Sequence, residues 1–158
     1  SKLTPEIKKH LAIIVAGDGD MRDPIQQTLT KLTPHVYLLG RIPPESVPAL
    51  LINGDIFVTN SSKETKGLTV IEAAAAGIPA IAPRAGGVID TIQEGVTGYL
   101  YQPQNESDFL TKLGLLINNQ NLRESMGIKA RQTVQQYSWE QVVDNLVEIW
   151  IEQIKQNK

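Results

Sequence analysis

The sequence contains no cysteine, two histidines and few aromatic residues. Without cysteine, the chain forms neither a disulfide nor a cysteine-ligated metal site. His10 and His35 are isolated, and no serine–histidine–aspartate grouping accompanies them. That grouping is the mark of many hydrolases, so the sequence gives no support to hydrolysis by a catalytic triad.

Long apolar runs and a strong charge of either sign are also missing. No run approaches the roughly 20 residues of a membrane-spanning helix, and the first ten residues, SKLTPEIKKH, lack a signal-peptide core. The net charge of −2 gives no general attraction to nucleic acid or anionic lipid. With 158 residues, of which 41% are hydrophobic, we expect one globular domain over 1–158, cytoplasmic and without a nucleic-acid partner.

Short apolar runs that suit strands buried on both faces alternate with segments of helical pattern. The expected strands are 11–17, 36–40, 55–60, 78–83 and 97–103, and the expected helices are 23–32, 44–53, 68–76, 87–92 and the segments from 105 onward. This alternation predicts an α/β fold with a Rossmann-like, doubly wound parallel sheet and a helical C-terminus. Ligands of such sheets bind outside the carboxyl ends of the strands, so we expect chemistry in the loops 17–22, 40–44, 59–67, 83–87 and 102–105.

The first of these loops, GDGDMR (17–22), resembles a dinucleotide fingerprint but has Arg22 where the third glycine belongs. Asp18 and Asp20 form an Asp-x-Asp pair of the kind that holds Mg²⁺ or Mn²⁺. No other acidic cluster joins them. A tight polar turn is therefore the favoured interpretation, and we expect no metal site.

The stretch NSSKETKGLTVIEAAAAGIPAIAPRAGG (60–87) places a polar loop directly before a helix of small residues. Gly67 comes just before this helix, where unpaired backbone amides and the helix dipole form a natural seat for phosphate. We expect glycine there because a side chain would crowd the phosphate. Ala73–Ala76 allow a close approach to the sheet, and Gly77 and Pro79 end the helix.

Two glutamates, Glu64 and Glu72, stand eight positions apart at this helix start. A carboxylate accepts hydrogen bonds from two adjacent hydroxyls, so either residue suits a ribose or a sugar. Each also has a structural interpretation. Thr69-x-x-Glu72 fits a capping box, and Glu64 fits a solvated loop charge.

Four cations border the same loops and are available to neutralise a diphosphate: Arg41, Lys63, Lys66 and Arg84. A solvated surface charge is the alternative for each of them, and it is favoured for Lys63.

The segment ETKGLTVIE (64–72), followed by AAAAGIPAIA, resembles the Glu-x7-Glu segment of retaining glycosyltransferases of family 4. Other segments resemble the C-terminal, donor-binding domain of these two-domain GT-B enzymes in the expected order. They are GDGDMRDPIQQTL, VYLLGRIPPESVPALLINGDIFVTNSS, RAGGVIDTIQEGVTGYLYQP and YSWEQVV. The resemblance therefore extends over nearly the whole chain.

By this resemblance, Glu64 would be the catalytic glutamate near the transferred sugar, and Glu72 would bind the ribose hydroxyls. The remaining substrate-binding residues that the resemblance implies are Gly67, Leu68 and Thr69 under the diphosphate, Arg41 and Ile42 beside the base, and Gly86 and Gly87 in a double-glycine loop. Lys66 replaces a frequent aromatic residue or leucine, so the sugar pocket differs from the common pattern. The segment ETKGL (64–68) also resembles the sequence ETQGL, which occurs in some lipid glycosyltransferases.

The resemblance implies a parent enzyme that transfers a sugar from a UDP- or GDP-sugar to a glycolipid or polysaccharide acceptor, with retained configuration and without metal or cofactor. The family's first strand, with its arginine and lysine, and its N-terminal acceptor domain have no counterpart here. We therefore expect a fragment that binds nucleotide weakly, self-associates and transfers no sugar alone, from a parent that can associate peripherally with the inner face of a membrane. The alternatives are a non-catalytic nucleotide- or sugar-phosphate-binding regulatory domain and a pure interaction domain.

Overall fold

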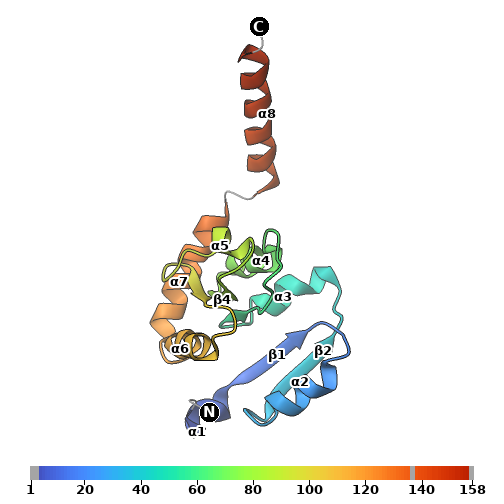
Figure 1. Ribbon diagram of the computed structural model, residues 1–158, viewed down its shortest axis with the longest axis vertical. Coiled ribbons are helices and arrows are strands. Elements are labelled where there is room, and N and C mark those ends of the chain that lie inside the picture. The colour runs from blue at the N-terminus through green and yellow to red at the C-terminus, as the bar shows by residue number, and fades with distance from the viewer. Residues whose placement is uncertain (1–3, 136–137, 157–158) are drawn as a thin grey trace. The chain divides into compact units, whose positions relative to one another are not determined.

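The computed structural model describes residues 4–135 and 138–156 (Figure 1). The chain divides into two compact units, residues 1–50 and residues 51–158. Each contains a parallel β-sheet with helices, which confirms the predicted α/β class. The expected single domain over 1–158 stays a prediction. None of the described helices combines the length and the apolar character needed to cross a membrane.

The first unit is built around two parallel strands. Its elements are α1 (Pro5–His10), β1 (Ala12–Ala16), α2 (Arg22–Leu29), β2 (His35–Gly40), the 3-10 helix η1 (Pro44–Ser46) and α3 (Val47–Leu51), which ends at the boundary. The predicted strands at 11–17 and 36–40 are confirmed as β1 and β2, with Ala12 opposite His35. Sequence reasoning missed α1, which begins where the Thr4 side chain accepts a hydrogen bond from the amide of Ile7 at 3.3 Å.

The second unit has three parallel strands in the order β3-β4-β5. Its elements are β3 (Phe57–Val58), α4 (Leu68–Ala75), β4 (Ala80–Pro83), α5 (Val88–Thr91), β5 (Gly98–Tyr101), α6 (Glu106–Ile117), α7 (Gln120–Val134) and α8 (Trp139–Gln156). Every predicted strand and helix of this part exists, although β3 is shorter than the predicted 55–60.

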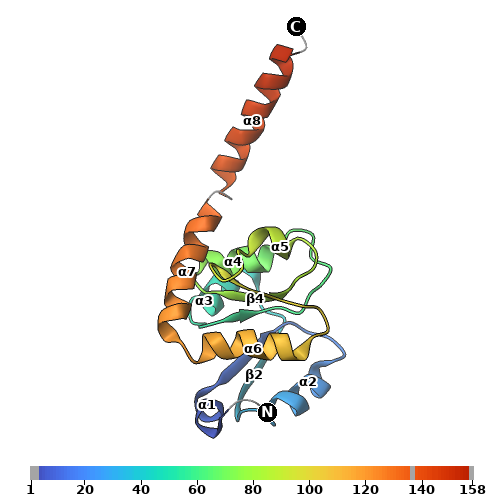
Figure 2. The same cartoon turned by 60° about the vertical axis from the view of Figure 1, so that its left-hand side comes forward.

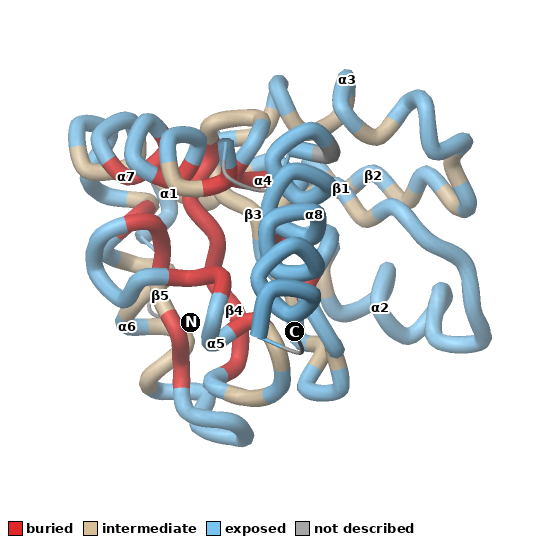
Figure 3. The backbone as a smooth tube through the Cα atoms, turned by 90° about the horizontal axis from the view of Figure 1, so that it is seen from above, coloured by how far each residue is buried: buried red, intermediate tan, exposed pale blue. Residues whose placement is uncertain are grey.

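Helices cover both faces of the three-stranded sheet in the second unit (Figure 2). On one face, α4 and α5 pack through Val70 and Val88 against Ala82 and Leu100. On the other face, α6 and α7 pack against Ile81 and Tyr101 in a core that includes Leu116 and Met126. Because successive strand residues point to opposite faces, β4 is buried along its whole length (Figure 3).

The small residues of α4 serve a second contact besides the sheet. Ala74 packs with Ala130 and Val134 of α7, so the alanine run also lets a neighbouring helix approach closely. The helix ends as predicted. Gly77 adopts a φ of +80°, and the amide of Ile78 bonds to Ala73 O at 3.1 Å, which closes the last turn.

Candidate functional site

Two loops that follow β3 and β4 are held together through their backbones. The amide of Gly87 donates to the carbonyl oxygen of Glu64 at 2.7 Å. The hydroxyl of Thr91, on α5, lies 3.1 Å from the carbonyl oxygen of Lys66. The structure therefore brings Glu64, Lys66 and Gly67 of the first loop against Gly86 and Gly87 of the second, at the carboxyl ends of the strands, where ligands of parallel sheets bind.

The double glycine at 86–87 is required by this contact. A Cβ at Gly86 would lie 2.6 Å from the carbonyl oxygen of Glu64, and one at Gly87 would lie 2.0 Å from that of Thr65. Gly86 also has a φ of +63°, which other residues adopt at a cost. These two residues thus let the backbone of the glutamate loop lie directly on the second loop.

Gly67 has a different reason for being glycine than the one expected from the sequence. Its φ is +70°, and a Cβ there would lie 2.9 Å from Cγ1 of the fully buried Val88. The missing side chain would therefore point into the core, so the expectation that it would crowd a phosphate is wrong. The left-handed backbone and the contact with α5 explain the residue.

The start of α4 also contradicts the capping-box interpretation of Glu72. The helix begins at Leu68 with Gly67 as N-cap, and no side chain makes a cap hydrogen bond. Thr69 is consequently the second helical residue, two positions too late to act as the cap. The amides of Val70 and Ile71 both bond to Gly67 O, whereas those of Leu68 and Thr69 have no acceptor among the described residues.

The two glutamates differ in their surroundings. The Glu72 side chain is exposed on α4, and Glu64 is half-buried in the loop. Neither carboxylate has a hydrogen-bond or ion-pair partner within the described part of the chain. Both carboxylates can therefore accept hydrogen bonds from a ligand, one in the loop before α4 and one on the helix itself. Lys66 is exposed in the same loop.

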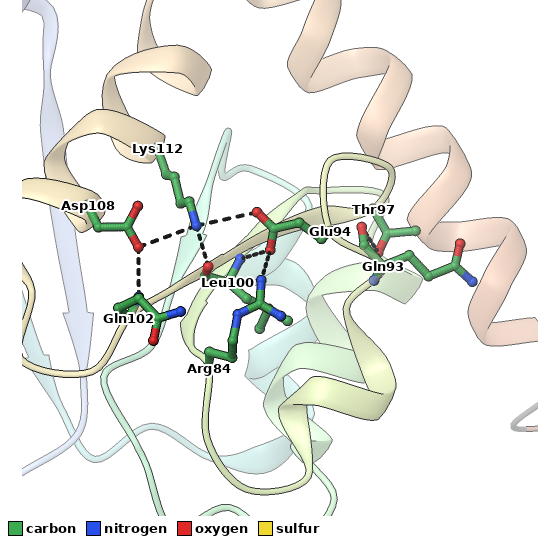
Figure 4. Close-up of polar contacts among 8 residues, drawn as sticks. All are labelled: Arg84, Gln93, Glu94, Thr97, Leu100, Gln102, Asp108 and Lys112. Atoms are coloured by element: carbon green, nitrogen blue, oxygen red, sulfur yellow. Dashed lines mark hydrogen bonds and ion pairs between the residues drawn. The ribbon is translucent and has the colours of Figure 1, made fainter.

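Arg84, an expected diphosphate cation, is engaged elsewhere (Figure 4). Its Nη2 lies 2.9 Å from Oε2 of Glu94, and the same carboxylate oxygen accepts the amide of Leu100 at 2.8 Å. Lys112 binds the carbonyl oxygen of Leu100 and lies 3.4 Å from both Glu94 and Asp108. The network supplies hydrogen-bond partners for the backbone amide and carbonyl of Leu100 at the outer edge of β5. Arg84 therefore belongs to a cluster that stabilises this sheet edge.

The remaining candidates lie in the first unit. Arg41 and Ile42 follow Gly40, whose carbonyl oxygen accepts the amide of Gly17 at 2.8 Å. Their contact with a base stays a prediction. An open cavity of about 230 Å³ lies beside the first loop, and its lining is Val15, Gly17, Asp18, Gly19, Met21, Arg22, Ile25 and Leu38.

The aspartate pair in this loop has one local hydrogen bond. An Asp18 carboxylate oxygen accepts the amide of Gly19 at 3.1 Å, as expected of a polar turn. No group of three or more histidines and carboxylates is placed to hold a metal ion within the described ranges. Metal independence stays a prediction.

Sequence reasoning missed Thr91 and the Glu94 cluster. Thr91 stands between the buried Val88 and Ile92 and is itself only 5% exposed. A hydroxyl at such an apolar position needs a carbonyl partner, so this pattern was the available signal. Glu94, Asp108 and Lys112 lie in separate segments, and the sequence offers no local pattern that joins them.

Comparison with known proteins identifies the family. The family model for glycosyl transferases group 1 matches residues 1–133. The chain belongs to the group 1 glycosyltransferases. It is 37% identical over 130 residues to the sulfoquinovosyl transferase SQD2 of Arabidopsis thaliana, covering 80% of this chain and 25% of that protein.

Two solved structures support the assignment. The C-terminal domain of a group 1 glycosyltransferase from Francisella tularensis is 25% identical, with a TM-score of 0.69, 78% of this chain covered and 68% of that one. A variant of S. aureus TarM in complex with fondaparinux, alpha-GlcNAc-glycerol and UDP is 27% identical, with a TM-score of 0.76. The match covers 87% of this chain and 28% of the TarM chain. The group 1 chain described here thus corresponds to part of a GT-B C-terminal domain and spans 25–41% of the first two curated relatives that it matches.

Proposed function

We propose that this chain is the donor-binding part of a retaining glycosyltransferase that uses a UDP- or GDP-sugar. The observation that carries the proposal is the start of α4. Among the described residues, the amides of Leu68 and Thr69 have no acceptor there, and the carboxylates of Glu64, in the preceding loop, and Glu72, on the helix, have no partner. Amides at a helix start bind phosphate, and carboxylates bind sugar hydroxyls. The UDP complex of TarM, a structure 27% identical to this chain, adds support.

Each candidate residue has a distinct role in this proposal. The amides of Leu68 and Thr69 receive the diphosphate, Glu72 accepts hydrogen bonds from the ribose hydroxyls, and Glu64 contacts the transferred sugar. Gly86 and Gly87 hold the Glu64 loop in place through the backbone contacts described above.

Catalysis in the parent enzyme would rest on positioning and charge stabilisation. The bond between the anomeric carbon and the diphosphate oxygen breaks while the acceptor hydroxyl oxygen bonds to that carbon and passes its proton to the departing diphosphate. Negative charge grows on the departing diphosphate, and the positive end of α4 stabilises it. The acceptor, of glycolipid or polysaccharide type, would be held outside this chain.

The test is an NMR titration of the ¹⁵N-labelled chain with UDP and GDP, because this method detects weak binding. We expect the amides of Gly67, Leu68 and Thr69 to shift in a saturable manner. Glu72→Gln should raise the dissociation constant for the nucleotide at least about tenfold, which corresponds to ~1.4 kcal/mol of binding free energy. Its free energy of unfolding should change by less than ~0.5 kcal/mol, since Glu72 caps nothing.

Glu106→Gln is the matched control, because Glu106 is also an exposed glutamate near a helix start. It should leave nucleotide affinity unchanged. If neither UDP nor GDP shifts these amides at millimolar concentration, the donor-binding proposal fails. If Glu72→Gln binds as tightly as Glu106→Gln, the ribose role fails.

A further inference from the structure

Thr91 joins the two loops of the candidate site through its side chain. The residue lies on α5 and is 5% exposed. Its hydroxyl oxygen is 3.1 Å from the carbonyl oxygen of Lys66 and 3.4 Å from that of Gly87. The Gly87 contact spans four residues within one helical turn, whereas the Lys66 contact spans 25 residues and reaches the other loop.

A hydroxyl has one proton, so Thr91 donates fully to one carbonyl at a time. The shorter distance favours Lys66. A bond from threonine to the carbonyl four residues earlier is common in helices and needs no further explanation. The bond to Lys66 differs because its acceptor belongs to the peptide that leads into Gly67.

The peptide between residues 66 and 67 controls how α4 begins. Gly67 holds a left-handed φ of +70° and supplies the carbonyl that accepts the amides of Val70 and Ile71. Rotation of the preceding peptide would therefore redirect the free amides of Leu68 and Thr69. The same loop carries Glu64, two residues before Lys66.

We propose that Thr91 is a positioning residue for the donor site. Its hydroxyl fixes the carbonyl of Lys66, and through it the orientation of the amides at the start of α4 and of the Glu64 loop. This inference rests on the proposed function, because it assigns Thr91 to the same donor site. Thr91 itself contacts no substrate in this role.

The chain contains a matched control for a purely structural threonine. Thr97 is 4% exposed, and its hydroxyl accepts the amide of Gln93 at 2.9 Å and lies 3.5 Å from the carbonyl oxygen of Gln93. Its contacts stay within the turn before β5, away from both site loops. Thr91→Val and Thr97→Val each replace a buried hydroxyl by a methyl group of similar shape.

The experiment compares Thr91→Val, Thr91→Ser and Thr97→Val in the ¹⁵N-labelled chain. We expect both valine variants to lose comparable thermal stability. Only Thr91→Val should speed amide hydrogen exchange at Val70 and Ile71, whose amides bond to Gly67 O, and weaken UDP binding at least about fivefold, the effect of one ordinary hydrogen bond. Thr91→Ser, which keeps the hydroxyl, should restore both.

The outcomes separate this inference from the proposed function. If the chain without substitutions binds UDP and Thr91→Val binds UDP as tightly as Thr97→Val does, the positioning role is overturned and donor binding stands. If Thr91→Ser behaves like Thr91→Val, the effect comes from packing, and the role is again overturned. If the chain without substitutions binds neither UDP nor GDP, the proposed function is overturned, and the positioning role is overturned with it.

Discussion

Gly127 of α7 lies against the backbone of Gly77, at the end of α4. A Cβ at position 127 would come within 1.9 Å of the carbonyl oxygen of Gly77. The neighbouring contact is made by Ala74 and Ala130, which are 7% and 2% exposed. Small residues on both helices therefore set how closely α7 packs on the helix that carries the candidate site.

We predict that Gly127→Ala destabilises the chain by about 1–3 kcal/mol, because the added methyl group has no space and the helices must separate. Gly114→Ala is the matched control, since Gly114 lies in α6 with nothing within 4 Å of a Cβ. That variant should gain roughly 0.5–1 kcal/mol, as alanine restricts the unfolded chain. Urea unfolding measures both. Equal stabilities for the two variants would show that the close contact is absent in solution.

A second prediction concerns Glu94, at the outer edge of β5. Its ion pair with Arg84 is 38% exposed on both sides and contributes little. Its hydrogen bond to the amide of Leu100 matters more, because removal leaves an edge amide without its partner. Glu94→Ala should therefore lower the free energy of unfolding by about 1–3 kcal/mol.

Arg84→Ala separates the exposed ion pair from the hydrogen bond to Leu100 and the 3.4 Å contact with Lys112, both of which only Glu94→Ala removes in the same urea experiment. It removes only the exposed ion pair, so its cost should stay below about 1 kcal/mol. Glu148→Ala, an exposed glutamate on α8, should be neutral. A loss in Arg84→Ala as large as that in Glu94→Ala would mean that the ion pair, and not the backbone bond, holds the edge.

Much of the fold was predictable because each strand carries its own local signal. Continuous apolar runs such as 78–83 indicate strands buried on both faces, and β4 is buried along its length. The ends were less predictable. β3 contains two residues, Phe57 and Val58, because only these have register partners in β4. The pattern of apolar residues does not record where pairing stops.

The candidate site was predictable as a set of loops but not as a set of contacts. The segment 64–72 marked Gly67 and both glutamates. The reason for Gly67 was misjudged, because its closest neighbour is Val88, 21 positions away in sequence. The capping box failed because α4 starts at Leu68, and a Thr-x-x-Glu pattern fixes no helix start by itself.

A third prediction follows from Asp108. The amide of Gln102 donates to its carboxylate at 2.7 Å, and this bond, with Lys112 nearby, lowers the pKa of Asp108 below its ordinary 3.8. A carboxyl with a lowered folded-state pKa stabilises the fold above its unfolded pKa, and that stability is lost as the pH falls through the folded value. Asp108→Asn should therefore make the melting temperature depend less on pH below about pH 4.

The measurement is a series of thermal melts between neutral pH and the acid range. Asp108→Asn should be less stable than the parent near neutral pH, and the two curves should converge in acid. Glu106→Gln, two residues away, removes an exposed carboxylate with no hydrogen-bond partner within the described ranges. It should follow the parent at every pH. Parallel curves for Asp108→Asn and the parent would contradict the assignment.

The last prediction is that nucleotide binding needs no metal ion. Asp18 and Asp20 are two carboxylates, and Asp18 already accepts the amide of Gly19. A Mg²⁺ site of high affinity usually needs more ligands than one such pair, although substrate phosphates can complete it. UDP affinity in EDTA should therefore equal that in Mg²⁺ or Mn²⁺. The double variant Asp18→Asn, Asp20→Asn should bind as the parent does, since asparagine keeps the oxygen that closes the turn. The double variant Glu45→Gln, Glu106→Gln changes the net charge equally and corrects for any general gain in anion affinity. Tight binding that requires Mn²⁺ and disappears only in the aspartate variant would assign the pair to a metal site instead.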